Sequence, residues 1–225
     1  MANDITFQNT AGSENHQAPA ITANSPHAVF YRCSFEGYQD TIYAMHGQQF
    51  YRECDIYGTV DFICGDAAII IQNSNIYLRK SETGNQITIA TSSRESLDSP
   101  TGIVIQNCRI MAAPDLKPVL DSYKIYLGRP WRSYARTIYI QNDFDIPVEK
   151  EGWLEWNGGP KSAKNTVDYR EYNNKGLGSS TNRRVRWPGY RSITDSSEVD
   201  EFSVANFIQG DSWLPSTGIT YNSGL

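Results

Sequence analysis

A short strand-like pattern recurs along the first half of the chain, and its spacing limits the folds that the chain can adopt. In each repeat a small residue follows a polar one, at successive steps of 23, 21, 20 and 34 residues. The small position carries Thr10, Cys33, Cys54, Ser74 and Cys108. The position three residues earlier carries Phe7, Phe30, Tyr51, Ile71 and Ile105, and the position two residues later carries Gly12, Phe35, Ile56, Ile76 and Ile110. Because alternate residues of a strand share one face, the pattern predicts one inward-facing strand in each repeat.

The length of this repeat favours a solenoid, in which each repeat stacks on the one before it. A leucine-rich repeat has a similar period, but its lattice of leucines is absent from this sequence. We therefore predict an all-β fold, a parallel β-helix with loop excursions and a short C-terminal helical segment; a β-sandwich with coincidental spacing is the alternative. The longest step contains residues 81–100, which we expect to loop out of the stack. The tripeptide Ile140-Gln141-Asn142 predicts a further coil, with Asp143 in the small position.

Two aspartates lie in otherwise apolar stretches, Asp40 in "GYQDTIY" and Asp61 in "GTVDFICG". Each lies seven residues beyond the small position of its coil, as Gln17 does in the coil before. Equivalent positions of neighbouring parallel strands lie about 5 Å apart, so we expect Asp40 and Asp61 side by side, with Gln17 on the far side of Asp40. Gln39 precedes Asp40 directly. Two carboxyl groups that close cannot both ionise easily, so the pair supplies a nucleophilic carboxylate and a carboxylic acid.

The composition excludes several other classes of function. The formal net charge is −5, which argues against DNA or RNA as a partner because phosphate binding needs basic clusters. No apolar run is long enough to cross a membrane, and residues 1–30 lack the basic and apolar segments of a signal peptide. The four cysteines form no CxxC pair and the three histidines form no HExxH motif, so no metal site is expected. Residues 1–225 are expected to form one domain.

Five motifs together resemble the plant-type pectin methylesterases, or pectinesterases. They are "GYQDT", "GTVDFICG", "YLGRPW", "GWLEWNG" and "FIQGDSWLP", in this order along the chain. The resemblance covers the chain from "DITFQNTAG" onward and implies a right-handed parallel β-helix that removes methyl esters from homogalacturonan (pectin) in the extracellular plant cell wall. It implies no cofactor and, besides pectin, a proteinaceous pectinesterase inhibitor as a partner; we also expect a monomer. Such chains usually begin further upstream, so we expect this one to be truncated at its N-terminal side relative to the family.

The resemblance also implies roles for individual residues. Asp61 in "TVDF" matches the nucleophile, and Asp40 in "YQDT" matches the general acid that later acts as a base. Gln39 matches a residue that stabilises the transition state. Gln17 in "NHQA" matches a second glutamine of the oxyanion pocket and the substrate site.

Arg129 and Trp131 in "LGRPW" match a pair of residues in the substrate site of the family. The repeat supports Arg129 independently. Arg129 lies 14 residues before Asp143, the small position of the coil that follows it, and Asp40 likewise lies 14 residues before Cys54. We therefore expect the guanidinium of Arg129 on the same strip of the β-helix, where it would keep Asp61 ionised and oriented through charge-assisted hydrogen bonds.

Other interpretations are open for the same chain. A pectate lyase would show clustered acidic calcium ligands, and a polygalacturonase would show grouped aspartates, and neither pattern is present beside the aspartate pair. A catalytically impaired pectin-binding fragment is a further alternative.

The "GDSW" at residues 210–213 is similar to a serine-esterase motif, but its place near the C-terminus favours a capping segment. Tyr38 and Tyr134 are weaker candidates for contact with sugar, and Cys33 and Cys54 either pair or remain stacked thiols.

Overall fold

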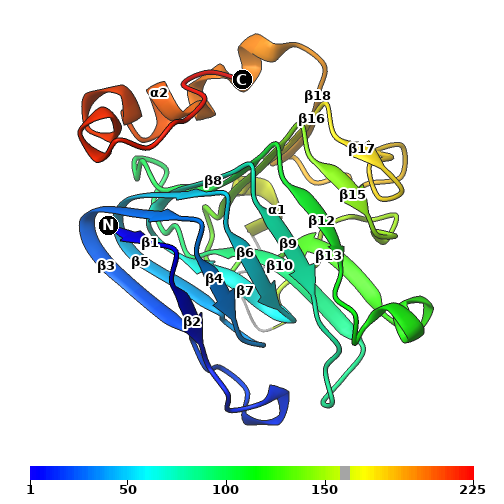
Figure 1. Cartoon of the computed structure of the whole chain (residues 1–225). Coiled ribbons are helices and arrows are strands. Elements are labelled where there is room, and N and C mark those ends of the chain that lie inside the picture. The colour runs from blue at the N-terminus through cyan, green and yellow to red at the C-terminus, as the bar shows by residue number, and fades with distance from the viewer. Residues whose placement is uncertain (158–162) are drawn as a thin grey trace.

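Each complete coil of the chain crosses three faces of a parallel solenoid, seen as three rows of strands in Figure 1. The computed structural model describes residues 1–157 and 163–225. All strand pairings among these residues are parallel. The predicted β-helix is therefore confirmed, and the β-sandwich alternative is excluded.

The strands fall into three rows. The first face contains β7 (Val60–Gly65), β10 (Gln86–Ser92) and β13 (Lys124–Gly128). The second face contains β1 (Ala2–Asn3), β8 (Ala68–Gln72), β11 (Gly102–Gln106), β14 (Arg136–Ile140), β16 (Asp168–Tyr172) and β18 (Tyr190–Ile193). The third face contains β2 (Thr6–Gln8), β4 (Ser34–Glu36), β6 (Asp55–Gly58), β9 (Asn75–Leu78), β12 (Arg109–Ala112), β15 (Asp143–Asp145) and β17 (Lys175–Gly176).

Two long strands, β3 (Ile21–Tyr31) and β5 (Ile42–Arg52), join the first face to the second. The start of β5 pairs with β7 and its end pairs with β8, so one strand passes around the corner between the two faces. Gly47 lies at this corner with φ of 80°, and an added Cβ would lie 2.0 Å from the carbonyl oxygen of Ser25. Only glycine fits this corner.

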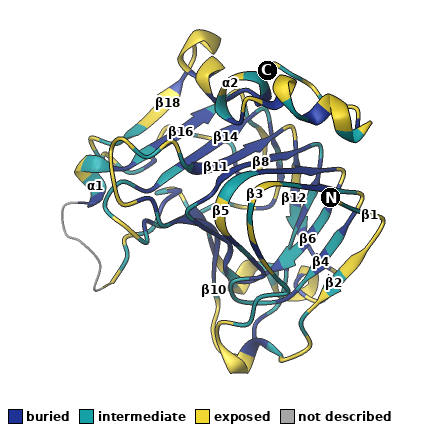
Figure 2. Cartoon of the chain, turned by 90° about the vertical axis from the view of Figure 1, so that its left-hand side faces the viewer, coloured by how far each residue is buried: buried dark blue, intermediate teal, exposed yellow. Residues whose placement is uncertain are grey.

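The interior is filled by stacked aliphatic and aromatic rungs. On the third face Phe35, Ile56, Ile76 and Ile110 occupy equivalent positions in successive coils, as the repeat predicts. All four side chains are fully buried. Figure 2 shows buried residues along the strands and exposed residues mainly in the loops beyond them. Full burial of such a side chain stabilises the fold by roughly 1.5–3 kcal/mol.

A residue in the left-handed conformation ends successive strands of the second face. These residues are Arg32, Glu53, Asn73, Asn107 and Gln141, with φ between 50° and 56°. They occupy the polar position of the repeat, just before the small position. The chain turns sharply here toward the third face, and the polar side chain is left at the surface or only partly covered.

The small position that follows forms a ladder of hydrogen bonds inside the solenoid. The N–H of Cys54 donates to Oγ of Ser74 at 3.0 Å, and the N–H of Ser74 donates to Sγ of Cys108 at 3.4 Å. The N–H of Cys108 donates to Oδ1 of Asn142 and that of Asn142 to Oδ1 of Asn174, each at 2.9 Å. Each small side chain therefore satisfies a backbone N–H of the preceding coil. The four cysteines are free thiols, so no disulfide joins Cys33 to Cys54.

The predicted register is wrong in the first coil. Phe7 pairs with Phe35 rather than with Phe30, which pairs with Ala2. The left-handed corner lies at Asp4, where φ is 55°. Thr10 and Gly12 are therefore outside the predicted columns, because the corner residue, and not the tripeptide Phe7-Gln8-Asn9, sets the register.

Two further predictions fail for related reasons. The corner of the later coil is Gln141, with φ of 56°, so Asn142 fills the small position in place of Asp143. The segment 81–100 does not loop out as a whole, because it contains β10, which pairs with β7 on one side and β13 on the other. Ile87 and Ile89 of β10 belong to the buried core, so this strand completes a rung of the first face.

A C-terminal segment covers the outer surface of the second face, and Figure 1 shows it in orange to red across the stack. It contains α2 (Val204–Phe207) and the 3₁₀ turns η3 (Ser196–Glu198), η4 (Asp200–Phe202), η5 (Gly210–Ser212) and η6 (Leu214–Thr217). Phe202 and Leu214 pack there against strand residues that include Val29 and Phe50. The remaining short helical elements are α1 (Ala163–Thr166), η1 (Ser13–Asn15) and η2 (Lys117–Ser122).

Candidate active site

A pocket of about 220 Å³ lies on the outer side of the first face. The six residues to which the sequence assigned catalytic or substrate-binding roles all line it, although they come from separate coils. The lining consists of Gln17, Gln39, Asp40, Asp61, Cys64, Thr91, Arg129, Trp131 and Trp156. The stacking of the first face therefore brings the predicted residues into one place.

Asp40 and Asp61 lie on adjacent rungs of this face. The register pairs Ile42 with Ile63, so Asp40 lies opposite Asp61, and the Asp40 N–H donates to the Val60 carbonyl at 3.1 Å. Both aspartates are in the left-handed conformation, with φ of 60° and 51°. Aspartate tolerates this region better than most residues because its short polar side chain bonds locally. The unusual backbone at both positions fits a site that holds its carboxyl groups in fixed directions.

A bulge in β7 accompanies the left-handed Asp61. Thr88 of β10 pairs with Val60 and Ala90 pairs with Ile63, so two residues of β7 lie opposite the single residue between Thr88 and Ala90. Bulges of this kind redirect a side chain and are frequent beside active sites.

Asp61 is buried, and its carboxylate is held by donors from one other strand, β10, and from the loop that follows β13. Thr88 and Thr91 each donate a hydroxyl hydrogen bond of 2.6 Å to Oδ1. Arg129 donates from Nε to Oδ1 at 2.9 Å and from Nη2 to Oδ2 at 2.6 Å. Hydrogen bonds of this kind favour a charged carboxylate, so the contacts suit Asp61 to act as an anion.

Asp40 is in the opposite electrostatic situation. Burial and the negative charge of Asp61 raise the pKa of Asp40 to about 7, and Arg129 only partly offsets this rise. A carboxyl group with this pKa is largely protonated at mildly acidic pH. The two neighbouring aspartates therefore differ, because Asp61 is held by Arg129 and two hydroxyl groups, whereas Asp40 can donate and recover a proton.

The two glutamines lie next to each other rather than in the predicted order. Gln17 forms an isolated parallel bridge with Gln39, so it is the neighbour of Gln39 and not of Asp40. The segment that follows Gln17 has one more residue than the corresponding part of the next coil, since Ile21 pairs with Ile42. The amides of Gln17 and Gln39 are therefore neighbours on adjacent coils, and so are the carboxyl groups of Asp40 and Asp61.

An aromatic wall closes the other side of the pocket. The Arg129 guanidinium lies 4.3 Å from the centroid of the Trp156 ring. Trp156 stacks with Trp131 at an interplanar angle of 9° and a centroid distance of 6.3 Å, and Tyr43 contacts Trp131 at 6.2 Å. The wall offers flat apolar surface to a ligand and also fixes the plane of the guanidinium.

Several site residues were not predicted from the sequence. Thr88 and Thr91 were missed because β10 was taken as a loop. Trp156 stands within the motif "GWLEWNG", but it was missed because no residue of that motif was assigned to the site. Cys64 follows three residues after Asp61 and lines the pocket, where burial and the nearby carboxyl groups raise its thiol pKa well above the ordinary value.

Other sequence candidates lie elsewhere. Tyr38 packs against the Arg79 guanidinium at 3.9 Å and does not line the pocket, and neither does Tyr134. Ser212 of the "GDSW" motif donates to the Gln209 carbonyl at 2.7 Å, within the segment that covers the second face. That motif therefore belongs to the segment that covers the side of the solenoid, not to a cap over its end as predicted, and it takes no part in the pocket.

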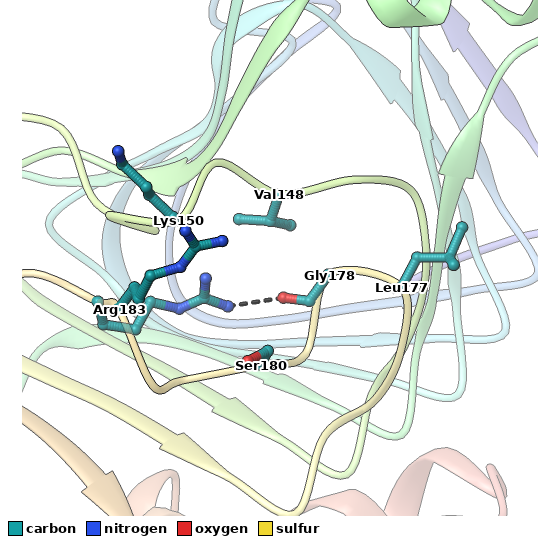
Figure 3. A pocket seen from close by; sticks show the side chains of 7 residues that line it. Val148, Lys150, Leu177, Gly178, Ser180 and Arg183 are labelled. Carbon is teal, nitrogen blue, oxygen red and sulfur yellow. Dashed lines mark hydrogen bonds between the residues drawn. The ribbon is translucent and has the colours of Figure 1, made fainter.

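A second hollow of about 170 Å³ lies near the ends of the later coils (Figure 3). Lys150 and Arg183 line it, and the buried guanidinium of Arg184 donates to the Gly178 carbonyl at 2.6 Å. The described residues that line it include no carboxyl group and so supply neither an acid nor a nucleophile like those of the first pocket. Within the described ranges 1–157 and 163–225, no cluster of metal-ligating side chains is found. No helix of these ranges has the length and apolar character to span a membrane.

Fold and site together define a parallel β-helix protein with two neighbouring aspartates in a pocket on its first face. Residues 1–211 match the family model described as Pectinesterase, and the chain belongs to the pectinesterase family. It is 53% identical over all of its 225 residues to pectinesterase 2 of Citrus sinensis, and it covers 44% of that protein. It is 50% identical to the probable pectinesterase/pectinesterase inhibitor 39 of Arabidopsis thaliana and covers 42% of it.

Solved structures agree with this assignment. A pectin methylesterase from carrot superposes with a TM-score of 0.95 and 43% identity, over 99% of this chain and 69% of the carrot chain. A pectin methylesterase from Aspergillus niger superposes with a TM-score of 0.76 and 33% identity, over 93% of this chain and 62% of the fungal chain. The predicted right-handed β-helix class is thereby confirmed. The chain spans less than half the length of the plant relatives cited above.

Proposed function

We propose that the chain hydrolyses methyl esters of homogalacturonan and releases methanol and pectate, as a carboxylic-ester hydrolase of the plant cell wall. The observation that carries the proposal is the adjacent pair of Asp40 and Asp61, one with its pKa raised to about 7 and the other held by Arg129. The family membership and the names of the plant relatives support the choice of substrate. The pocket itself supports the chemistry.

The reaction would begin with attack by the Asp61 carboxylate on the carbonyl carbon of the methyl ester. The oxygen that becomes negative would be stabilised by the side-chain amides of Gln17 and Gln39, which lie in one row. The bond to the methoxy group would then break as Asp40 donates its proton to the departing oxygen. Methanol leaves, and the galacturonyl group remains joined to Asp61 as an anhydride.

The second half would regenerate the site. Asp40, now a carboxylate, would take a proton from a water molecule that attacks the galacturonyl carbon. The bond to Asp61 breaks, Asp61 regains its carboxylate, and the new carboxylic acid loses its proton to water and leaves as a pectate anion. Trp131 and Trp156 would contact the apolar faces of the sugar rings beside the reacting ester.

The test is to measure methanol release from highly methylated homogalacturonan together with the length of the polymer, with and without a metal chelator. We expect methanol, unchanged polymer length and no effect of the chelator. Shorter polymer would indicate a polygalacturonase, and new ultraviolet-absorbing unsaturated ends would indicate a lyase. Either of those results, without methanol, would contradict the proposal.

A pectin-binding protein without esterase activity is the second candidate, and the stacked Trp131 and Trp156, which offer flat apolar surface to a sugar, favour it. This candidate would be supported if the parent chain binds methylated pectin but releases methanol no faster than Asp61→Asn. A proteinaceous inhibitor is a further partner that we propose, since several relatives carry that term in their names. Inhibition of methanol release by a purified plant pectinesterase inhibitor would test it.

A further inference from the structure

The two oxygens of the Asp61 carboxylate are not equivalent. Oδ1 accepts hydrogen bonds from Thr88, Thr91 and Nε of Arg129, at 2.6, 2.6 and 2.9 Å. Among the described residues Oδ2 accepts from Arg129 alone, at 2.6 Å from Nη2 and at 3.1 Å from Nε, which also donates to Oδ1. The lone pairs of Oδ1 are therefore occupied by three donors, whereas Oδ2 keeps unshared electron density.

Arg129 alone could not create this difference. A guanidinium edge presents two N–H donors to two carboxylate oxygens, and the pairing is unchanged when the carboxylate turns by half a rotation. The two threonine hydroxyls remove this symmetry, because both donate to the same oxygen. Thr88 and Thr91 are 0% and 1% exposed, so water does not compete for these bonds.

Thr88 also ties the side chain of Asp61 to its own backbone. Its Oγ1 accepts the Asp61 N–H at 3.0 Å and donates to Asp61 Oδ1 at 2.6 Å. Both hydrogen bonds are made to Asp61, the left-handed residue at the bulge of β7 where the register with β10 changes. The backbone conformation and the carboxylate direction of Asp61 are thus fixed by one hydroxyl group.

On this basis, and resting on the function proposed above, we propose that Thr88 and Thr91 are positioning residues that reserve Oδ1 and leave Oδ2 as the oxygen that attacks the ester. Oδ2 would form the bond to the carbonyl carbon, and Oδ1 would become the carbonyl oxygen of the anhydride. The threonine donors would stabilise the Oδ1 side of the carboxylate before attack and would hold the plane of Asp61 steady through both halves of the reaction.

The test compares Thr91→Val, which removes the hydroxyl at similar volume, with Thr91→Ser, which keeps it. We expect Thr91→Val to lower kcat by about 10²-fold while KM changes little, and Thr91→Ser to recover most of the rate. Thr137→Val is the matched control. Thr137 is a fully buried threonine of β14, and its Oγ1 has no hydrogen-bond partner among the described residues. This control should keep the parent kcat.

Crystal structures of the parent and of Thr91→Val give a second measurement that does not depend on activity. We expect one orientation of the Asp61 carboxylate in the parent and a rotated or divided orientation in the variant. Methanol release by the parent tests the proposed function separately. An unmoved carboxylate in Thr91→Val would overturn the positioning role, and so would an unchanged kcat or a loss that Thr91→Ser fails to recover.

Discussion

The guanidinium of Arg129 meets the carboxylate of Asp61 edge to edge, with Nε 2.9 Å from Oδ1 and Nη2 2.6 Å from Oδ2. The two side chains are only 19% and 4% exposed, so the contact lies largely outside bulk water. The guanidinium face lies over Trp156 at 4.3 Å. One cation therefore orients the candidate nucleophile and also connects it to the aromatic wall of the pocket.

Replacing Arg129 with lysine should lower kcat by about 10²-fold while the fold is retained. A single ammonium cannot donate to both oxygens of Asp61 in one plane, nor lie flat over Trp156. The measurement is steady-state methanol release, with circular dichroism to check the fold. Arg109→Lys, at an exposed ion pair with Asp145 on the third face, is the control and should leave kcat unchanged. Equal rates for Arg129→Lys and the parent would contradict the role of the paired contact.

Asp61→Asn should abolish turnover, with a loss of roughly 10³-fold or more, because the amide is not a nucleophile. Asparagine also tolerates the left-handed backbone at this position, so the thermal unfolding temperature should change little. Combining Asp61→Asn with Asp40→Asn should cost hardly more than the first change alone, since the two groups act in one reaction. Additive losses from the two changes would argue against a shared mechanism.

The rate should fall on the alkaline side of a pH near 7. Asp40 must carry a proton to release methanol, and its pKa is raised to about 7 by burial and by Asp61. The measurement is the pH profile of kcat/KM on a methylated oligogalacturonide, which reports on the free enzyme. A rate that stays level to about pH 9 would show that Asp40 does not act as the acid.

Asp40→Asn should become more stable relative to the parent as the pH rises. In the parent, the folded state holds a proton on Asp40 up to about pH 7, whereas the unfolded chain releases it at the ordinary carboxyl value. Stability of the parent therefore falls as the pH rises through this window. Thermal unfolding at about pH 4 and about pH 8 gives the comparison. A variant that loses stability relative to the parent at the higher pH would contradict the raised pKa.

Asn142→Ala should destabilise the fold by about 2–4 kcal/mol, because it leaves the buried N–H of Cys108 without an acceptor. The same side chain donates to the Ile105 carbonyl at 2.9 Å, so a second buried group also loses its partner. Chemical denaturation measures the effect. Arg109→Ala, which removes an exposed ion pair with Asp145, should change stability by less than about 1 kcal/mol. Similar losses in both variants would mean that the internal ladder contributes little.

The fold and the site residues were predictable to different extents. Stacking of Phe35 on Ile56, and of Asp40 opposite Asp61, follows from the repeat because parallel coils keep a constant register where their lengths match. The first coil could not be aligned this way, since its corner is set by the left-handed Asp4 and a backbone conformation leaves only a weak trace in the sequence.

The supporting residues of the site were harder to predict for a physical reason. Thr88 and Thr91 lie on β10 in the longest step of the repeat, where the additional residues of the coil and the bulge opposite β7 break the constant spacing. Gln17 was assigned to the pocket, but it lies opposite Gln39 and not Asp40, because the first coil does not follow the register of the later ones. Trp156 could have been found from its place in a quoted motif. The roles proposed for these residues stay predictions.

The internal ladder gives the solenoid a direction. Each coil supplies an N–H, and the coil after it supplies the side chain that accepts it, from Cys54 through Ser74, Cys108 and Asn142 to Asn174. The same side chains also reach back to the preceding coil, since Nδ2 of Asn142 donates to the Ile105 carbonyl and Nδ2 of Asn174 donates to the Tyr139 carbonyl. Loss of a later coil would leave backbone N–H groups without an acceptor, and loss of an earlier coil would leave side-chain amides without one. The ladder therefore resists shortening of the stack from either side.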